Sequence, residues 1–318
     1  MWAMGAIIVK TGSVAESKSR PHPVYETNLG KMYRGKAEEL LLRHPFCPKR
    51  NQVQLIFTSP PFPLNRKKKY GNLQGMEYVG WLAGFAGLFR ALLKRDGSLV
   101  VELGNAWEPG RPVMSTLALK ALLALQEGGN FYLCQEFICY NPARLPSPAQ
   151  WVNVERIRVK DSFTRLWWMS PSDRPKADNR RVLKQYSDSM RKLLISGKYN
   201  AGKRPSEHNI GETSFLADNG GAIPPNVLQI ANTQASDDYQ NFCRLRHVPP
   251  HPSRMPLDLP KFFIKFLTDE GDLVLDPFAG SNTTGAAAEL LRRRWLSVEV
   301  QPDYVESSRG RFRQPSLV

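Results

Sequence analysis

Apolar residues occur along the chain in two alternating patterns. Short, nearly continuous apolar runs predict buried strands, and apolar positions three or four residues apart predict amphipathic helices. Such runs occupy residues 53–57, 98–103, 131–140, 272–276 and 295–300. Helical spacing marks residues 37–42, 77–95, 114–126 and 257–267. Alternating strands and helices predict an α/β fold with a doubly wound, mostly parallel sheet, whose ligands lie at the carboxyl ends of the strands.

The stretch from residue 141 to residue 250 breaks this pattern. Prolines and charges become more frequent and the periodicity weakens, which predicts an inserted lobe of long loops outside the sheet. Residues 141–210 contain 15 Lys and Arg against 6 Asp and Glu, so this stretch holds 9 of the net +15 charges of the 318-residue chain. A basic excess gathered in one segment predicts a surface for a polyanion, although an ordinary solvated basic surface has the same composition.

The first motif that carries chemistry is Thr-Ser-Pro-Pro-Phe at residues 58–62, at the end of a predicted strand. Pro60 and Pro61 have no N–H, so the turn is stiff and offers acceptors only. The Ser59 hydroxyl and the Pro60 carbonyl can accept both hydrogens of an amine, and Phe62 can stack on the ring that bears it. The motif therefore predicts a catalytic site for a planar, amine-bearing ring. An ordinary strand-to-loop turn is the alternative.

The second motif runs from Asp276 to Gly285 and consists of a strand end, a glycine-containing turn and a helix opened by threonine caps. Asn282 replaces the second glycine of the dinucleotide fingerprint, and Asp276 would repel a pyrophosphate but attract the α-ammonium group of a methionine moiety. Glu299 follows 23 residues after Asp276, a spacing that suits an acid accepting both ribose hydroxyls. The motif favours S-adenosylmethionine over NAD, and a glycine turn that only packs a helix on the sheet is the alternative. The predicted cofactor-binding residues are Asp276, Pro277, Phe278, Gly280, Ser281, Asn282, Thr283, Thr284 and Glu299.

Together the two motifs resemble the amino-methylating DNA methyltransferases of restriction–modification systems. The match is to the β-class order, in which the catalytic motif precedes the cofactor motif, and to the cytosine-N4 branch. The resemblance extends from Gly30 to Arg309 and includes further segments at 68–73, 145–148, 156–161, 218–221, 223–226 and 251–252. It implies a Rossmann-like, S-adenosylmethionine-dependent methyltransferase sheet with an inserted basic DNA-recognition lobe.

The resemblance also implies a reaction and partners. Methyl would pass from S-adenosylmethionine to the exocyclic N4 amine of a cytosine flipped out of double-stranded DNA, leaving S-adenosylhomocysteine. The methylated site would be protected from a paired restriction endonuclease, and the protein would work in the cytoplasm of a bacterium or archaeon, with no membrane partner.

The resemblance assigns roles to residues and exposes two departures. Adenine-methylating relatives often carry Asp at the position of Ser59, so serine favours cytosine N4. Glu102 takes the position of the relatives' Asp as proton acceptor or positioning carboxylate, and a solvated strand end is the alternative. The acid that relatives place at the adenine end of the cofactor is missing, since this chain has Gly35-Lys36. Methylation at carbon 5 would need a cysteine at the catalytic strand end, and Cys47 lies upstream.

Basic residues near the catalytic motif and in the lobe are the predicted DNA contacts. The run Arg66, Lys67, Lys68 and Lys69 flanks the catalytic turn, where it could grip the backbone beside the flipped base. A solvated loop is the alternative. Other predicted phosphate or cleft contacts, which alternate at strand spacing on one face, are Arg156, Arg158 and Lys160. Base readout is expected from Arg and Asn side chains of the lobe, without individual assignment.

The predicted division of the chain has three working parts. Residues 24–140 form the catalytic half of the methyltransferase domain, 141–250 the target-recognition lobe, and 251–310 the cofactor-binding half. Residues 1–23 and 311–318 are expected to be loose termini. The oligomeric state is left open.

Other features limit the alternatives. Cys243, His247 and His251 recur every four residues, but Pro249 and Pro250 break any helix that would align them, so no metal site is predicted. The four cysteines lack a disulfide framework, and no apolar run is long enough for a membrane span. Three rival functions stay open: adenine-N6 methylation of DNA, methylation of RNA or a small molecule, and DNA binding without catalysis.

Overall fold

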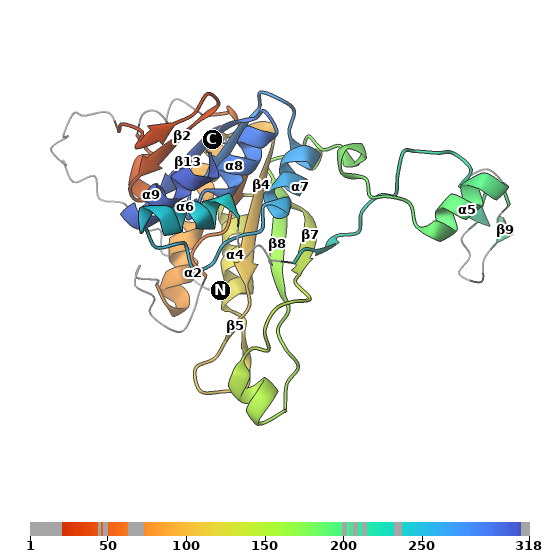
Figure 1. Ribbon diagram of the computed structural model, residues 1–318, viewed down its shortest axis with the longest axis horizontal. Coiled ribbons are helices and arrows are strands. Elements are labelled where there is room, and N and C mark those ends of the chain that lie inside the picture. Colours follow the sequence, from red (N-terminus) through yellow and green to blue (C-terminus); the bar gives the residue numbers. More distant parts are fainter. Residues whose placement is uncertain are drawn as a thin grey trace, which may run out of the picture.

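A mixed, nine-stranded sheet forms the centre of the part of the chain that the computed structural model describes, which is residues 21–43, 46, 50–62, 73–198, 202–203, 205, 209–211, 215–231 and 237–312. The strand order is β1-β2-β13-β12-β3-β4-β8-β7-β11 (Figure 1). Neighbouring strands from β2 to β4 run parallel, whereas β8 is antiparallel to both β4 and β7. The bounds are β1 Tyr25–Glu26, β2 Gly30–Arg34, β3 Val53–Thr58, β4 Leu93–Gly104, β7 Tyr132–Tyr140, β8 Phe163–Ser170, β11 Val227–Gln229, β12 Leu273–Asp276 and β13 Arg294–Glu299.

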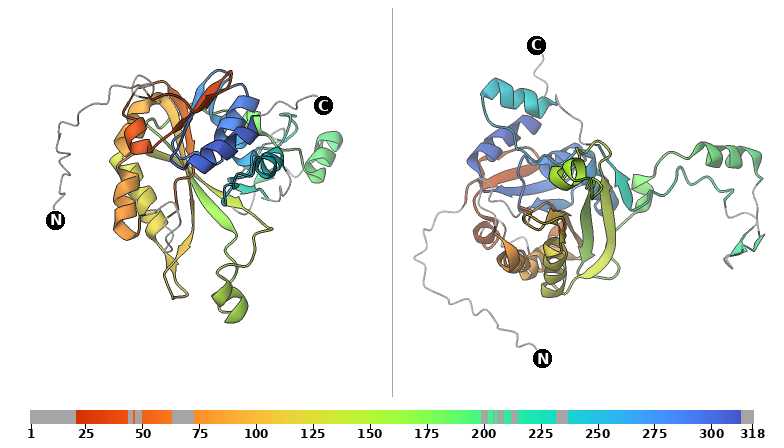
Figure 2. Two further views of the ribbon diagram at one scale, coloured as in Figure 1. Left: turned by 60° about the vertical axis from the view of Figure 1, so that its left-hand side comes forward. Right: turned by 90° about the horizontal axis from the view of Figure 1, so that it is seen from below.

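Helices cover both faces of this sheet (Figure 2). The strand β3 shows why, because Ile56 packs into one hydrophobic cluster while Leu55 and Phe57 pack into the other. A strand buried on both faces is apolar at nearly every position, which is the continuous run seen in the sequence. The first cluster contains α1 Ala37–Leu40, α2 Gly75–Ala83, α3 Ala86–Leu92 and α4 Leu117–Gly128, and the second contains α7 Asp258–Leu267, α8 Thr283–Leu290 and α9 Pro302–Ser308. The predicted doubly wound, mostly parallel α/β sheet is confirmed.

Two predicted helices differ in detail from the observed ones. The helix expected at 77–95 is two helices, α2 and α3, separated at Gly84, and the chain already enters β4 at Leu93, because Leu93 pairs with Val53 in the sheet. The helix expected from Met114 begins at Leu117 instead. The preceding residues, Met114–Ser115, form strand β6, which pairs with β5, Ala106–Trp107.

The sequence suggested that the stretch 141–250 forms a lobe outside the sheet, but two of its strands belong to the sheet. Strand β8 lies inside the sheet between β4 and β7, and β11 forms its edge. The strand β8 contains a buried run from Leu166 to Ser170, and the Trp168 indole N–H donates to Ser98 Oγ at 2.9 Å. The frequent charges on either side of this short run concealed it in the sequence.

Two extensions flank these strands (Figure 1). One, here called the finger, consists of residues 105–115 and 141–162 and continues from the end of the sheet where β4 and β7 terminate. The other, here called the arm, comprises the described residues of 183–226 and carries α5, Asp188–Ser196. Helix α5 begins at a Ser187 cap, ends at Gly197 in the left-handed conformation, and has no buried residue. All three views of the ribbon show the arm standing away from the body.

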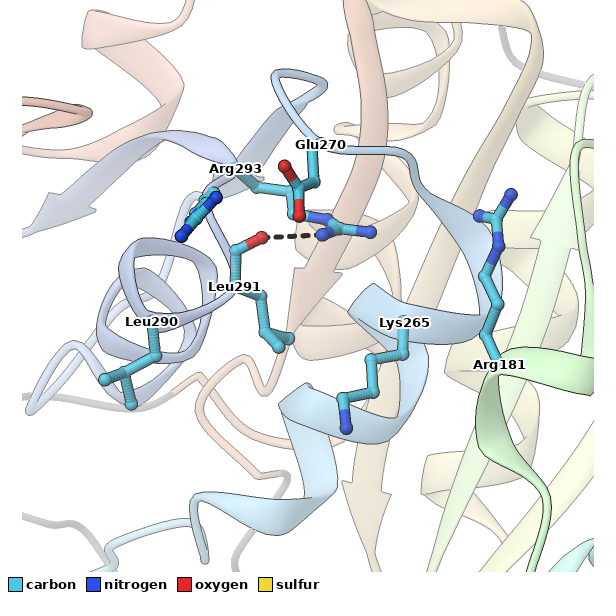
Figure 3. Close-up of a pocket in the computed structure, with 7 residues that line it drawn as sticks. Arg181, Lys265, Glu270, Leu290, Leu291 and Arg293 are labelled. Atoms are coloured by element: carbon cyan, nitrogen blue, oxygen red, sulfur yellow. Dashed lines mark hydrogen bonds between the residues drawn. The ribbon is translucent and has the colours of Figure 1, made fainter.

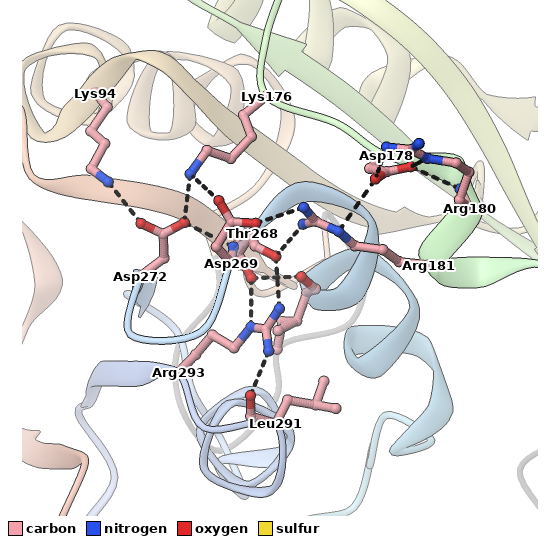
Figure 4. A network of polar contacts seen from close by, with 11 residues as sticks. Lys94, Lys176, Asp178, Arg180, Arg181, Thr268, Asp269, Asp272, Leu291 and Arg293 are labelled. Carbon is pink, nitrogen blue, oxygen red and sulfur yellow. Dashed lines mark hydrogen bonds and ion pairs between the residues drawn. The ribbon is translucent and has the colours of Figure 1, made fainter.

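An ion-pair network fastens the segment between β8 and the arm to the opposite, amino end of the strands (Figure 4). Asp272 accepts from Lys94 at 2.8 Å and from Lys176 at 3.0 Å, and Lys176 also binds Asp269 at 2.8 Å. Arg181 pairs with Asp269 at 2.6 Å. The network therefore joins β4, the segment after β8 and the loop before β12.

A hollow of about 340 Å³ lies beside this network, lined by Arg181, Lys265, Glu270 and residues 290–293 (Figure 3). It lies at the amino ends of β12 and β13, away from the end of the sheet that carries the two motifs. Among the described residues, no helix is long and apolar enough to cross a membrane.

Candidate active site

The two motifs lie side by side at the carboxyl ends of neighbouring strands. Strand β3 ends in Thr58 and its parallel neighbour β12 ends in Asp276. The Thr58 hydroxyl donates to Asp276 Oδ1 at 2.8 Å, and both side chains are buried although 218 residues separate them. The structure thus brings the catalytic corner and the cofactor turn into one site.

The catalytic corner follows directly from β3. Ser59 is half-buried, Pro60 is buried, and the Phe62 ring packs over Gly104 at the end of β4. A Cβ atom at Gly104 would lie 2.5 Å from Phe62 Cε2, so only glycine leaves the ring in this place. Ser59 lies close enough to Glu102 to lower the pKa of its carboxyl, which places a hydroxyl and a carboxylate at the same strand ends.

Glu102 is buried within the sheet rather than solvated. Its side chain is only 8% exposed, and the Thr164 hydroxyl donates to Glu102 Oε1 at 2.7 Å. Burial raises the pKa of Glu102, while the hydrogen bonds from Thr164 and Ser59 and the charge of Arg144 act in the opposite direction. The solvated-strand-end alternative is therefore wrong, and the carboxylate is held in a fixed place beside Ser59.

Thr164 and Arg144 are site residues that the sequence did not reveal. Thr164 is the second residue of β8 and pairs with Gly104 in the antiparallel ladder, which brings its hydroxyl to Glu102. Arg144 is half-buried and donates to the Phe163 carbonyl at 3.1 Å, close enough to Glu102 to lower its pKa. Only the pairing of β8 with β4 makes these residues neighbours of Glu102, and no local pattern signals that pairing.

The cofactor turn depends on two residues in the left-handed conformation. Gly280 has φ +51, and a Cβ there would lie 3.0 Å from His251 Nε2, so glycine is needed for both conformation and space. Asn282 has φ +55 and caps α8, since its Oδ1 accepts from the Gly285 N–H at 3.2 Å. Ser297 also donates to this oxygen, at 2.7 Å. The helix is therefore capped by Asn282, not by the threonines expected from the sequence.

Two buried acids flank the turn. Asp276 accepts from the Thr284 hydroxyl at 2.6 Å and from the Phe278 N–H at 3.1 Å, and burial raises its pKa to about 6. Glu299 accepts from the N–H groups of Gly280 and Gln301, both at 2.8 Å. Burial raises the pKa of Glu299, and the nearby charge of Asp276 raises it further. Two carboxylates that repel each other at a buried turn favour a cationic ligand.

The remaining predicted cofactor residues are mostly buried in the turn. Ser281 binds Arg311, whose Nε donates to the Ser281 carbonyl at 2.7 Å and whose Nη2 donates to its hydroxyl at 3.0 Å. Thr283 lies 3.3 Å from the same hydroxyl. Pro277 is buried, whereas Phe278 is half-buried and packs against Trp81 with ring centroids 5.3 Å apart.

The predicted DNA contacts have mixed outcomes. Arg66, Lys67, Lys68 and Lys69 lie outside the described residues. Arg156, Arg158 and Lys160 lie exposed on the finger, but the strand that would align them does not form. Instead, a π-helical turn at Gln150–Val154 reverses the chain, and Arg156 has φ +58. The departure at Gly35-Lys36 lies beside Glu299, because the Gly35 N–H donates to the Glu299 carbonyl at 3.0 Å.

Comparison with known proteins supplies relatives of this chain. A family model described as DNA methylase matches residues 53–309. The Type II methyltransferase M.PvuII of Proteus hauseri is 46% identical over 292 residues, which are 91% of this chain and 85% of that protein.

Solved structures agree with this likeness. The structure of PvuII DNA methyltransferase (cytosine-N4-specific) has a TM-score of 0.75 at 38% identity and covers 94% of this chain and 91% of its own. The complex of M1.HpyAVI with SAM has a TM-score of 0.53 at 18% identity, covering 89% and 100% of the two chains, which is a likeness of fold alone.

Proposed function

This chain belongs to the DNA methylase family, and on that premise we propose that it methylates the exocyclic N4 amine of a flipped cytosine in double-stranded DNA. S-adenosylmethionine is the proposed donor, S-adenosylhomocysteine the product, and protection from a paired restriction endonuclease the biological role. The observation that carries the proposal is the meeting of the two motifs, in which the Thr58 hydroxyl donates to Asp276 at 2.8 Å. The cytosine-N4-specific relative at 38% identity supports the choice of base.

The proposed catalytic groups act on the amine from one side. The amine of cytosine is a weak nucleophile, since its lone pair is delocalised into the ring, and acceptors for both its hydrogens favour the pyramidal transition state. With Glu102 beside it, Ser59 would direct its own proton to that carboxylate, which leaves the Oγ lone pairs free to accept one amine hydrogen. The Pro60 carbonyl accepts the other, and Phe62 stacks on the ring. Glu102 stabilises the positive charge that develops on nitrogen and takes up the released proton through Ser59.

The acids at the cofactor turn fit S-adenosylmethionine. When bound, this donor supplies an electrophilic methyl group on a sulfonium. Asp276 would hold its α-ammonium group, and Glu299, which ends β13 beside the turn, would accept the ribose hydroxyls. A pyrophosphate would meet two carboxylates instead, so the same turn disfavours a dinucleotide. Pro277, Phe278, Gly280, Ser281, Asn282, Thr283 and Thr284 are proposed to shape the turn around the donor.

The proposed DNA surface lies around the finger, the arm and the loop that follows the catalytic corner. Arg66, Lys67, Lys68 and Lys69 are proposed to hold the backbone beside the flipped nucleotide. The exposed Arg156, Arg158 and Lys160 contribute positive charge on the finger. Transfer of tritium from labelled S-adenosylmethionine tests the proposal, since label must enter duplex DNA and not RNA. Plasmid from cells that express the chain should also resist a subset of restriction enzymes.

Replacement of Asp276 by Asn should weaken binding of S-adenosylmethionine by about 10- to 100-fold, since a hydrogen bond to a charged group contributes about 1.5–3 kcal/mol. Wild-type affinity should fall as pH drops through about 6, where Asp276 becomes protonated, and Asp276→Asn should lack this dependence. Because the folded-state pKa lies above the ordinary 3.8, ionised Asp276 adds no stability at pH 7. The melting temperature of Asp276→Asn at pH 7 should therefore not decrease. Isothermal titration and thermal melting measure both.

The exposed Asp188 supplies a matched control, since Asp188→Asn removes one charge on the arm, which stands away from the turn (Figure 1). Its cofactor affinity should equal that of the wild type. An Asp276→Asn variant that binds the donor normally would show that this carboxylate serves the fold alone.

Replacement of Thr164 by Val should change the dependence of kcat on pH, so that the loss of activity on the acid side occurs at a higher pH. The hydrogen bond from Thr164 lowers the pKa of Glu102, so its loss raises that pKa and protonates Glu102 at a higher pH. At neutral pH, kcat should fall by about five- to tenfold, the value of one hydrogen bond of about 1 kcal/mol. Thr164→Ser restores the hydroxyl and should restore both values. A reduced kcat with an unmoved acid limb would mean that Thr164 only packs.

A further inference from the structure

Two segments that share the family resemblance noted in the sequence, residues 145–148 and 156–161, take no part in the chemistry above. The structure joins them within the finger, where the Asp161 N–H donates to the Ser147 carbonyl at 2.9 Å. The Asn105 amide donates to Asp161 Oδ1 at 2.9 Å, which ties both segments to the end of β4. The rings of Trp107 and Trp151 pack with centroids 5.5 Å apart. The finger is thus an ordered body rather than two separate loops.

On an ordinary solvated surface, charged groups point into water and large apolar side chains are mostly covered. Part of the outer surface of the finger shows the opposite arrangement. The charged ends of two of its cations bind the finger's own backbone: Arg158 Nε donates to the Pro112 carbonyl at 3.1 Å, and Lys160 Nζ donates to the Pro142 carbonyl at 3.0 Å. Between them, Val159 is 87% exposed, and Leu145 on the adjoining segment is 81% exposed. Among the described residues, only Ile195 on the arm is a large apolar side chain of comparable exposure. Large apolar side chains held outward on a rigid support mark a surface that a partner covers.

The position of the finger identifies double-stranded DNA as that partner. Its two parts continue from the strand ends that carry Glu102 and Thr164 (Figure 1). A duplex whose nucleotide occupied the Ser59 site would therefore lie against the finger. The chain carries a net charge of +15, and five cations (Arg111, Arg144, Arg156, Arg158 and Lys160) outnumber three acids (Glu108, Glu155 and Asp161) on the finger. A nucleotide that leaves the stack exposes the apolar faces of its neighbouring bases, and proteins often place apolar side chains against unstacked steps.

We propose that the finger is a wedge, in which Leu145 and Val159 enter the duplex beside the target and pack on the bases exposed when the cytosine leaves the stack. The inference rests on the proposed methylation of a flipped base. The two side chains offset part of the cost of flipping, so their contribution depends on how firmly the target base is paired. This dependence separates a wedge from an ordinary DNA contact.

The test compares the double variant Leu145→Ser/Val159→Ser with the wild type on two duplexes. One carries a correctly paired target cytosine, and the other carries an abasic site opposite that cytosine, which makes flipping easier. On the paired duplex, kcat/KM should fall by about 10- to 100-fold, the loss expected for one to two apolar side chains that no longer become buried. On the abasic duplex it should fall less than about threefold.

The control variant is Leu290→Ser, which removes an apolar side chain that is 63% exposed at the far end of α8. It should behave as the wild type on both duplexes. Equal losses of the double variant on the two duplexes, or no loss on the paired one, would overturn the wedge. A wild-type dimer that the double variant converts to a monomer, with unchanged kcat/KM, would also overturn it in favour of a second copy. If the proposed function itself fails, the wild type methylates neither duplex, so the two failures are distinct.

Discussion

Replacement of Ser59 by Ala should lower kcat for DNA methylation by about 100- to 1,000-fold, the usual effect of removing one preorganised hydrogen-bonding group from a transition state. The hydroxyl contacts Glu102 and, in the proposed complex, the amine that becomes positively charged. Because this interaction strengthens only as the reaction proceeds, affinities for DNA and S-adenosylmethionine should stay within about twofold of wild type. Single-turnover transfer of tritium to duplex DNA measures the effect.

Ser172→Ala is a matched control, since Ser172 lies just after β8, at the opposite end of the sheet, and its hydroxyl accepts from the Arg174 N–H at 3.0 Å. Its kcat should equal that of the wild type. If Ser59→Ala transfers label as fast as the wild type, the hydroxyl has no role in the reaction.

Replacement of Glu102 by Gln should reduce kcat by about 100- to 10,000-fold, the range for loss of a positioned proton acceptor. The amide keeps the shape of the side chain and can accept from Thr164, but it neither balances the developing charge nor takes up a proton. Wild-type activity should fall as pH decreases through the raised pKa of Glu102, because protonation removes the carboxylate. The Gln variant should lack this limb.

The stability of Glu102→Gln separates a catalytic from a structural role. Burial raises the pKa of Glu102 in the folded state, so its ionised form adds no stability at neutral pH, and Glu102→Gln should not melt at a lower temperature. Glu102→Asp keeps the charge on a shorter side chain and should retain more activity than the Gln variant. Full activity of Glu102→Gln across the pH range would remove Glu102 from the mechanism.

The parts of the site that follow from local sequence were predictable. The run before Ser59 is apolar at nearly every position because β3 is buried on both faces, and this pattern identifies a central strand. Parallel strands place their carboxyl ends at one edge, so the meeting of Ser59 with the Asp276 turn followed from the fold class. The hydrogen bond from Thr58 to Asp276 directly joins the two strand ends.

Features that depend on pairing between distant segments could not be predicted. The strand β8 lies in a stretch rich in charge and proline, and only its partners β4 and β7 reveal it. The pairing of β8 with β4 brings the Thr164 hydroxyl to Glu102, and no pattern in the neighbouring sequence indicates this pairing. Likewise, spacing alone suggested a strand for Arg156, Arg158 and Lys160. Instead, the side chains of Arg158 and Lys160 donate to backbone carbonyls across the finger, and this segment forms an irregular turn.

The identity of the methylated base tests the account most directly. DNA treated with the wild-type chain and S-adenosylmethionine is digested to nucleosides, which are separated and weighed by mass spectrometry. The account predicts N4-methylcytosine from the wild type and almost none from Ser59→Ala. N6-methyladenine or 5-methylcytosine as the product, or no methylated base at all, would contradict it.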